Sequence, residues 1–180
     1  MMRLETTAFH RRSMAERIRR ATRLGIALGL GAAATHAAAV TCTVSTPGVA
    51  FGSYDVYAAS ATNGNGTLSI TCSLDPADQG AQKLVPYVIS LSTGSSGSFV
   101  QRTMKSGSNA LRYNLYTSNA YSVVWGDGTG STSTQSGSHV LNNGHPTLTS
   151  SFTAYGRIPA LQDAAVASDY RDNVTATVTW

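Results

Sequence analysis

Two cysteines are the residues of this chain with the clearest chemistry. Cys42 and Cys72 each lie in a run of alternating apolar and polar residues, and both fall on the apolar phase. Two thiols that point into one core favour a disulfide, which would close a loop of about 30 residues. A metal site is the competing interpretation, but nothing with the ligand spacing of a zinc site accompanies either cysteine.

Groups that could support catalysis are sparse. His139 and His145 lie in a stretch rich in Ser, Gly and Asn, so we expect both to be solvated loop residues. No Gly-x-Ser-x-Gly nucleophile turn is present, and no spacing favours a Ser-His-Asp triad. Asp127 lies between two glycines, which is typical of a tight turn; a calcium site is the weaker interpretation because neighbouring carboxylates are scarce. The sequence therefore predicts no enzyme, no catalytic residues, and no metal or cofactor.

Residues 1–37 have the pattern of a secretory signal peptide. Seven arginines precede an apolar, small-residue run over 24–34, and small residues near 37–39 offer a cleavage site. The apolar run is too short for a bilayer, which takes about 20 residues to span. We expect an exported chain that does not span the membrane, with its mature domain over 38–180. Met14 is an alternative start.

Removal of this leader changes the charge of the chain. The sequence has 13 Lys and Arg and 9 Asp and Glu, with a formal net charge of +4. The leader holds seven of the basic residues and two of the acidic ones, so the mature part carries six basic and seven acidic residues and a net charge near −1. No basic stripe remains, and nucleic-acid binding is not expected.

The mature part has the composition of a β-protein. Its roughly 140 residues suffice for one domain with a modest core. Ser, Thr, Gly, Val and Tyr are frequent, Lys and Glu are rare, and turn residues recur about every ten positions. We expect an all-β, immunoglobulin-like sandwich of about six to eight short strands. The expected strands cover 39–45, 49–51, 66–73, 85–91, 110–117, 122–125, 148–158 and 170–180.

The run over 170–180 has the alternation of a half-buried strand. Val174, Ala176, Val178 and Trp180 share one face of it, and polar residues occupy the other. An edge with unpaired backbone groups invites pairing, so either an earlier strand or another polypeptide must cover this one. The alternative is that these four residues are ordinary core of a complete sandwich.

Several short motifs follow one another along the mature chain. They include Gly66-Thr67-Leu68-Ser69-Ile70-Thr71-Cys72, Arg102-Thr103-Met104, Leu111-Arg112-Tyr113-Asn114-Leu115-Tyr116, Trp125-Gly126-Asp127-Gly128, Tyr155-Gly156-Arg157-Ile158-Pro159 and the terminal strand. In this order they resemble the spore coat protein U domain of archaic chaperone-usher pilus subunits. Together they cover nearly all of the mature chain. Each motif is weak alone, but the ordered set is specific.

The resemblance implies an incomplete sandwich whose last strand is supplied in trans. A periplasmic pilus chaperone would hold the subunit, and an outer-membrane usher would then exchange the chaperone for the amino-terminal extension of a neighbouring subunit. The expected product is a pilus or coat at the cell surface, serving adhesion and biofilm formation. Val174, Ala176, Val178 and Trp180 are the expected contacts with the chaperone or the donor strand.

The amino terminus of the mature chain departs from this pattern. Only residues 38–41 separate a cleavage point near 37 from Cys42, whereas a useful added strand takes about five residues. We therefore expect a subunit that accepts a strand but donates one poorly, as a tip or minor subunit would. The alternative function is a free-standing, lectin-like binding module that uses loops over 118–121 or 139–145.

Overall fold

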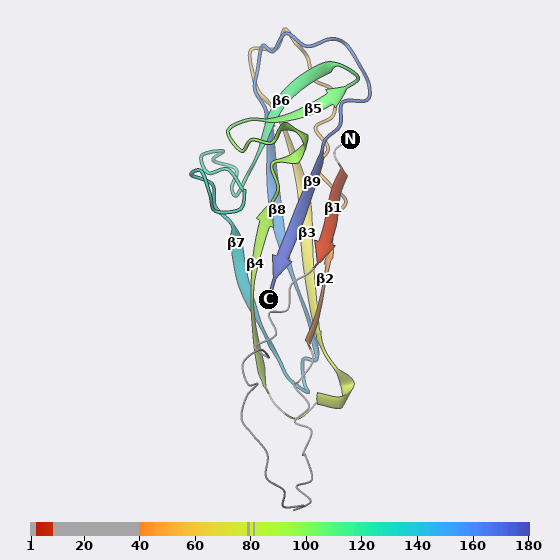
Figure 1. The fold of residues 1–180 in the computed structure, drawn as a ribbon, viewed down its shortest axis with the longest axis vertical. Helices are drawn as coiled ribbons and strands as arrows, with labels where there is room; N and C mark the ends of the chain where they lie inside the picture. Colours follow the sequence, from red (N-terminus) through yellow and green to blue (C-terminus); the bar gives the residue numbers. More distant parts are fainter. Residues whose placement is uncertain (1–2, 9–39, 79, 81) are drawn as a thin grey trace, which may run out of the picture.

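The computed structural model describes residues 3–8, 40–78, 80 and 82–180, and this part of the chain is almost entirely β-structure (Figure 1). Apart from Arg3–Ala8, the predicted signal peptide lies outside the described residues, as does its cleavage site. The strands are β1 (Arg3–Ala8), β2 (Val40–Ser45), β3 (Thr62–Leu74), β4 (Lys83–Leu91), β5 (Arg102–Ser106), β6 (Asn109–Tyr116), β7 (Gln135–Leu141), β8 (Thr147–Ile158) and β9 (Asn173–Thr179), with two short 3-10 helices, η1 (Pro76–Asp78) and η2 (Gly94–Ser96).

The strands form two sheets around one core. One sheet has the order β1-β9-β4-β7, and the other has the order β2-β3-β8-β6-β5. All pairings between these strands are antiparallel except that of β1 with β9, which is parallel. The prediction of an all-β, immunoglobulin-like sandwich is confirmed.

The core follows the two-residue period of the strands. In β3, Leu68, Ile70 and Cys72 are buried, while the residues between them lie on the outer face. The two inner faces meet as they do in other sandwiches, with side chains from both sheets in one cluster. Its other members include Val85, Tyr87, Ile89, Leu91, Leu111, Tyr113, Leu115, Trp125, Leu141, Ile158, Val174, Ala176 and Val178.

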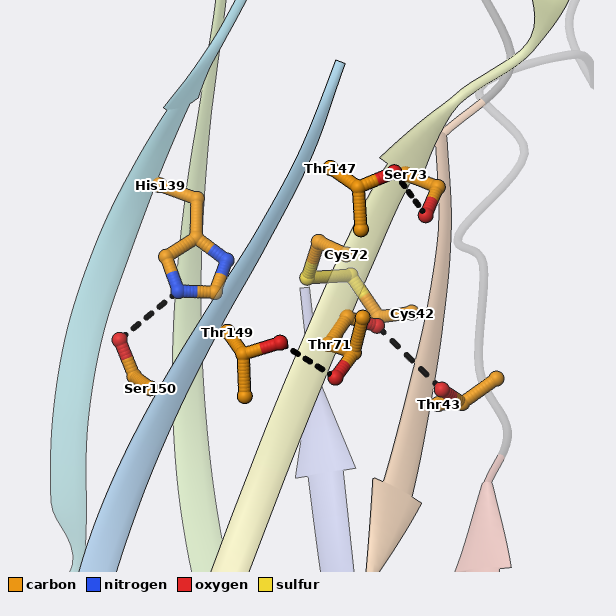
Figure 2. The surroundings of a disulfide bond; sticks show 9 residues. All are labelled: Cys42, Thr43, Thr71, Cys72, Ser73, His139, Thr147, Thr149 and Ser150. Carbon is orange, nitrogen blue, oxygen red and sulfur yellow. Dashed lines mark hydrogen bonds between the residues drawn. A yellow bond between two sulfur atoms is a disulfide. The ribbon is translucent and has the colours of Figure 1, made fainter. Parts of the chain in front are cut away.

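The two cysteines form the predicted disulfide. Cys42 on β2 stands directly opposite Cys72 on β3, with their Cα atoms 4.0 Å apart (Figure 2). Both side chains are buried, and the bond consumes both thiols, so the metal-site alternative is wrong. The bond ties β2, an edge strand, to the interior of its sheet.

Three strands, β1, β5 and β7, lie where the sequence predicted none. The Ser- and Gly-rich composition of β7 is typical of a loop, and its pairing partner β4 makes it a strand. Tyr87 stands opposite Gly137 and covers it so closely that a Cβ there would lie 2.5 Å from the Tyr87 hydroxyl oxygen. Conversely, the expected strands over 49–51 and 122–125 form only isolated bridges.

The prediction that His139 is a solvated loop residue is wrong. Its side chain is only 4% exposed, on β7, and its ring packs edge-on against Tyr87 at 5.1 Å between centroids. Nε2 lies 2.8 Å from the Ser150 hydroxyl (Figure 2), and the buried Nδ1 has no hydrogen-bond partner. Burial lowers the pKa of His139, since the charged ring would lose its hydration. His145, by contrast, is exposed in the turn before β8.

Replacing both cysteines, Cys42→Ala with Cys72→Ala, should lower the free energy of unfolding by about 3 to 4 kcal/mol, because the unfolded chain regains the entropy of an open loop. Urea denaturation of the full chain measures this loss. Reduction of the wild-type disulfide should give a similar loss. A double variant as stable as the oxidised wild type would contradict the prediction.

Acid should destabilise the chain through His139. Its folded pKa lies below its unfolded value of about 6.5, so the unfolded state binds the proton first, and stability falls as the pH drops below about 6.5. His139→Gln should flatten the dependence of unfolding free energy on pH between about 5 and 7. Equal slopes for wild type and His139→Gln would refute this assignment.

Candidate functional site

The terminal strand β9 carries the residues predicted to line a groove. Val174, Ala176 and Val178 face the core, with exposures of 0%, 0% and 1%. Trp180 follows the last strand residue and is 37% exposed. Three of the four predicted residues thus share one buried face, and the fourth lies at its exposed end.

The backbone of β9 divides its hydrogen-bonding groups between two neighbours. The Thr175 N–H donates to the Ser92 hydroxyl at 2.9 Å, and the Thr175 carbonyl accepts from the Ser92 N–H at 2.9 Å. Thr175 therefore faces the side of β4. Because successive residues of a strand point their amide groups to opposite sides, Val174, Ala176 and Val178 face the other edge. The residues whose side chains fill the core are those whose backbone groups need a second strand.

In the structure, β1 covers this second edge. It runs parallel to β9 over six consecutive residue pairs, and it lies where the edge of one sheet approaches β2 of the other (Figure 1). The register places Leu4 opposite Val174, Thr6 opposite Ala176 and Ala8 opposite Val178. The outer edge of β9 therefore has a strand position that the predicted leader occupies.

A buried carboxylate fixes the start of β9. Asp172 is 3% exposed and accepts four hydrogen bonds, from the Ser95 N–H (2.9 Å), the Ser95 hydroxyl (2.7 Å), the Tyr113 hydroxyl (2.6 Å) and the Asn173 N–H (2.8 Å). Gly94 makes room for it, since a Cβ there would lie 2.2 Å from a carboxylate oxygen. Burial, and then the negative charge of Asp172, raise the pKa of Tyr113, which keeps its proton for this bond.

A buried arginine holds the neighbouring chain segments together. The fully buried Arg102 donates to the Asn114 side-chain oxygen (2.7 Å), to the Ser92 carbonyl through two nitrogens (3.0 and 2.7 Å) and to the Trp125 carbonyl (2.8 Å). Burial lowers the pKa of Arg102. Ser92 therefore links Arg102 to β9, so this end of the strand is fixed by bonds that do not involve its outer edge.

Sequence reasoning did not find this polar cluster. Arg102 lies in one of the family motifs, which assigns it no role, and no motif singles out Asp172. The available signal was the alternation itself, because Asp172 and Arg102 fall on phases that strand continuation would bury.

The Trp125-Gly126-Asp127-Gly128 motif combines an anchor with a turn. Trp125 is fully buried, and its indole N–H donates to the Ile89 carbonyl of β4 at 3.1 Å. Asp127 is exposed and accepts hydrogen bonds from the Thr129 N–H (2.9 Å) and hydroxyl (2.6 Å), which lower the pKa of the carboxyl group. Gly128 has a φ of 89°, which favours glycine. The motif thus ties the loop after β6 to β4.

The Tyr155-Gly156-Arg157-Ile158-Pro159 motif covers the carboxyl-terminal end of β8 and the residue after it. A Cβ at Gly156 would lie 2.6 Å from the Phe51 ring, so only glycine fits beneath that ring. Ile158 is buried in the core, and the Pro159 carbonyl, just after β8, accepts from the Tyr54 hydroxyl at 2.9 Å. This motif is structural packing and does not reach β9.

An aromatic cluster lies on the outer face near the same motif. Tyr155 of β8 pairs with Tyr116 of β6, and the Tyr121 ring lies edge-on to Tyr116 at 5.5 Å. The Arg157 guanidinium lies 5.0 Å from the centre of the Tyr121 ring. Tyr121 has a φ of 52°, an uncommon conformation for a bulky residue.

Other kinds of site have little support in the described residues. Over 3–8, 40–78, 80 and 82–180, no group of three or more His, Cys, Asp or Glu side chains is placed to hold a metal ion. A cavity of about 490 Å³ between β5, β6 and residues 159–163 has no lining residue from β9. No helix in the described part is long and apolar enough to cross a membrane.

The fold and the site together define a class of protein. It is a two-sheet sandwich in which the C-terminal strand is fixed on one edge by its own fold and carries a parallel strand on the other. The chain belongs to the Spore Coat Protein U domain family, which matches residues 30–177. The resemblance drawn from the ordered motifs is confirmed.

One solved structure is similar to this chain at 19% sequence identity and a TM-score of 0.42. It is the CsuC–CsuE chaperone–tip adhesion subunit pre-assembly complex from archaic chaperone-usher Csu pili of Acinetobacter baumannii. The likeness covers 79% of this chain and 40% of that one, so the chain spans well under half of its length. No match was found among curated proteins.

Asp172→Asn should lower the free energy of unfolding of the full chain by about 2 kcal/mol, because it replaces a charged acceptor of buried hydrogen bonds with an amide. Chemical denaturation measures the change. The exposed Asp169→Asn is the matched control and should leave the midpoint unchanged. Equal midpoints for the two variants would show that the buried carboxylate does not fix β9.

Proposed function

We propose that this chain is a non-enzymatic structural subunit of a surface pilus or coat, assembled by a chaperone-usher route through donor-strand complementation. The observation that carries the proposal is the outer edge of β9, where Val174, Ala176 and Val178 face a strand position filled by residues 3–8. Those residues belong to the predicted leader. Once the leader is removed, this edge needs a strand from another polypeptide.

The partners follow from the order of assembly. A periplasmic chaperone protects the open edge after export, an outer-membrane usher receives the complex, and a neighbouring subunit supplies the permanent strand. Main-chain hydrogen bonds along β9 give such an added strand its affinity, and the side chains that meet Val174, Ala176 and Val178 give it specificity. The finished fibre lies at the cell surface and serves adhesion or biofilm formation.

The position of β2 favours a tip or minor subunit. This strand begins at Val40, so cleavage near 37–39 leaves at most a few residues ahead of it. A donor strand of useful length takes about five residues. The chain therefore receives a strand but has too little free amino terminus to give one.

The aromatic cluster supports the alternative, a free-standing binding module. Tyr121 is held at a φ of 52° between Tyr116 and Arg157, and such outliers occur at binding sites. Tyrosine rings near a surface suit stacking on sugars. This function needs a sandwich that is stable without a partner strand, which is the point on which the two candidates differ.

Production of residues 38–180 in an oxidising compartment, alone and with a candidate chaperone, separates the two functions. Alone, the chain should aggregate or be degraded; with the chaperone, or with a peptide of alternating apolar residues, it should be recovered as a discrete species. A peptide of the same composition without the alternation is the matched control and should not rescue it. Recovery of a stable, partner-free monomer would refute the subunit assignment and favour the binding module.

A further inference from the structure

We infer that Arg3–Ala8 is an intramolecular plug of the β9 edge, so that a chain that keeps its amino terminus closes its own groove and becomes able to accept a strand only after the leader is removed. This inference rests on the proposed function, because it concerns what controls access to the same edge. It assigns the leader a second role beyond export.

The backbone pairing of β1 with β9 supports this inference. Six consecutive residues of β1 are in register with β9, from Arg3 opposite Asn173 to Ala8 opposite Val178. Thr175 faces β4, so Val174 and its alternate neighbours direct their amide groups at β1. In a parallel ladder with this register, the residues of β1 that face β9 are Arg3, Glu5 and Thr7.

The covalent connection gives the plug an advantage over any free strand. Residues 9–39 join β1 to β2, and a tethered segment competes at an effective concentration on the order of a millimolar for short connections. A donor strand at micromolar concentration would have to bind about 1,000-fold more tightly to displace it. Cleavage between β1 and β2 removes this advantage in one step, which makes leader removal the event that opens the edge.

The sequence of the plug suits a temporary occupant. The positions opposite Val174, Ala176 and Val178 hold Leu4, Thr6 and Ala8, which are one large apolar residue, one polar residue and one small residue. Burial of apolar surface contributes about 25 cal/mol per Å², so a strand with large apolar residues at all three positions would bind more tightly. The plug therefore covers the edge while it is tethered, and a strand that binds more tightly replaces it once the leader has been cleaved.

Amide hydrogen exchange of the full chain, with its amino terminus retained, tests the plug. Wild type should show strong protection at Val174, Ala176 and Val178. Glu5→Pro, which removes a β1 amide that faces β9, should lower that protection about tenfold or more while the amides of Thr175 and Thr177 on the β4 side stay protected. Glu5→Thr also removes the carboxylate but keeps the amide and favours a strand, so it should match wild type.

A second measurement covers the case in which Glu5→Pro aggregates. A synthetic peptide with the sequence of residues 1–10 should then restore a discrete species and protect Val174, Ala176 and Val178 again. Protection of these three amides that is the same in Glu5→Pro and wild type, without added peptide, would overturn the plug. That result leaves the proposed function standing if an alternating apolar peptide still rescues residues 38–180. Failure of that rescue would instead count against the proposed function.

Discussion

The structure depends on the backbone hydrogen bonds of β9. Unpaired amides along the edge of a strand invite pairing with a further strand. One edge of β9 is satisfied by β4 and Ser92. The other edge belongs to Val174, Ala176 and Val178, and it is satisfied here by the parallel pairing of β1.

The position of β1 is bordered by β9 of one sheet and β2 of the other, and other interactions hold these two strands in place. Asp172 and Arg102 fix the start of β9 through buried hydrogen bonds that an absent outer strand would not break. On the other sheet, the disulfide between Cys42 and Cys72 holds the edge strand β2 against β3. The position between the sheets thus keeps its shape through interactions made elsewhere. Under the proposed function, such an arrangement would favour exchange of one strand for another over loss of the fold.

The sequence predicted the features that depend on local periodicity. Strict alternation identified the buried face of β9, and the shared phase of the two cysteines identified the disulfide. The sequence failed where pairing partners decide the outcome: β7 is a strand because it pairs with β4, and His139 on this strand is buried. The Arg102 and Asp172 cluster was also missed, because the hydrogen bonds of Asp172 with Ser95 and Tyr113 join residues 77 and 59 positions apart, beyond any short sequence window. The strand phase favours burial of Asp172 but does not predict its partners.

Under the proposed function, the outer edge of β9 is open in the leader-free chain and closes when a strand is added. Residue-resolved amide exchange on residues 38–180 measures this, with a short labelling pulse at a dilution below the onset of aggregation, with and without an alternating apolar peptide. We expect rapid exchange at Val174, Ala176 and Val178 without the peptide, protection with it, and steady protection of Thr175 and Thr177 in both states. Full protection of all five amides before any strand is added would contradict it.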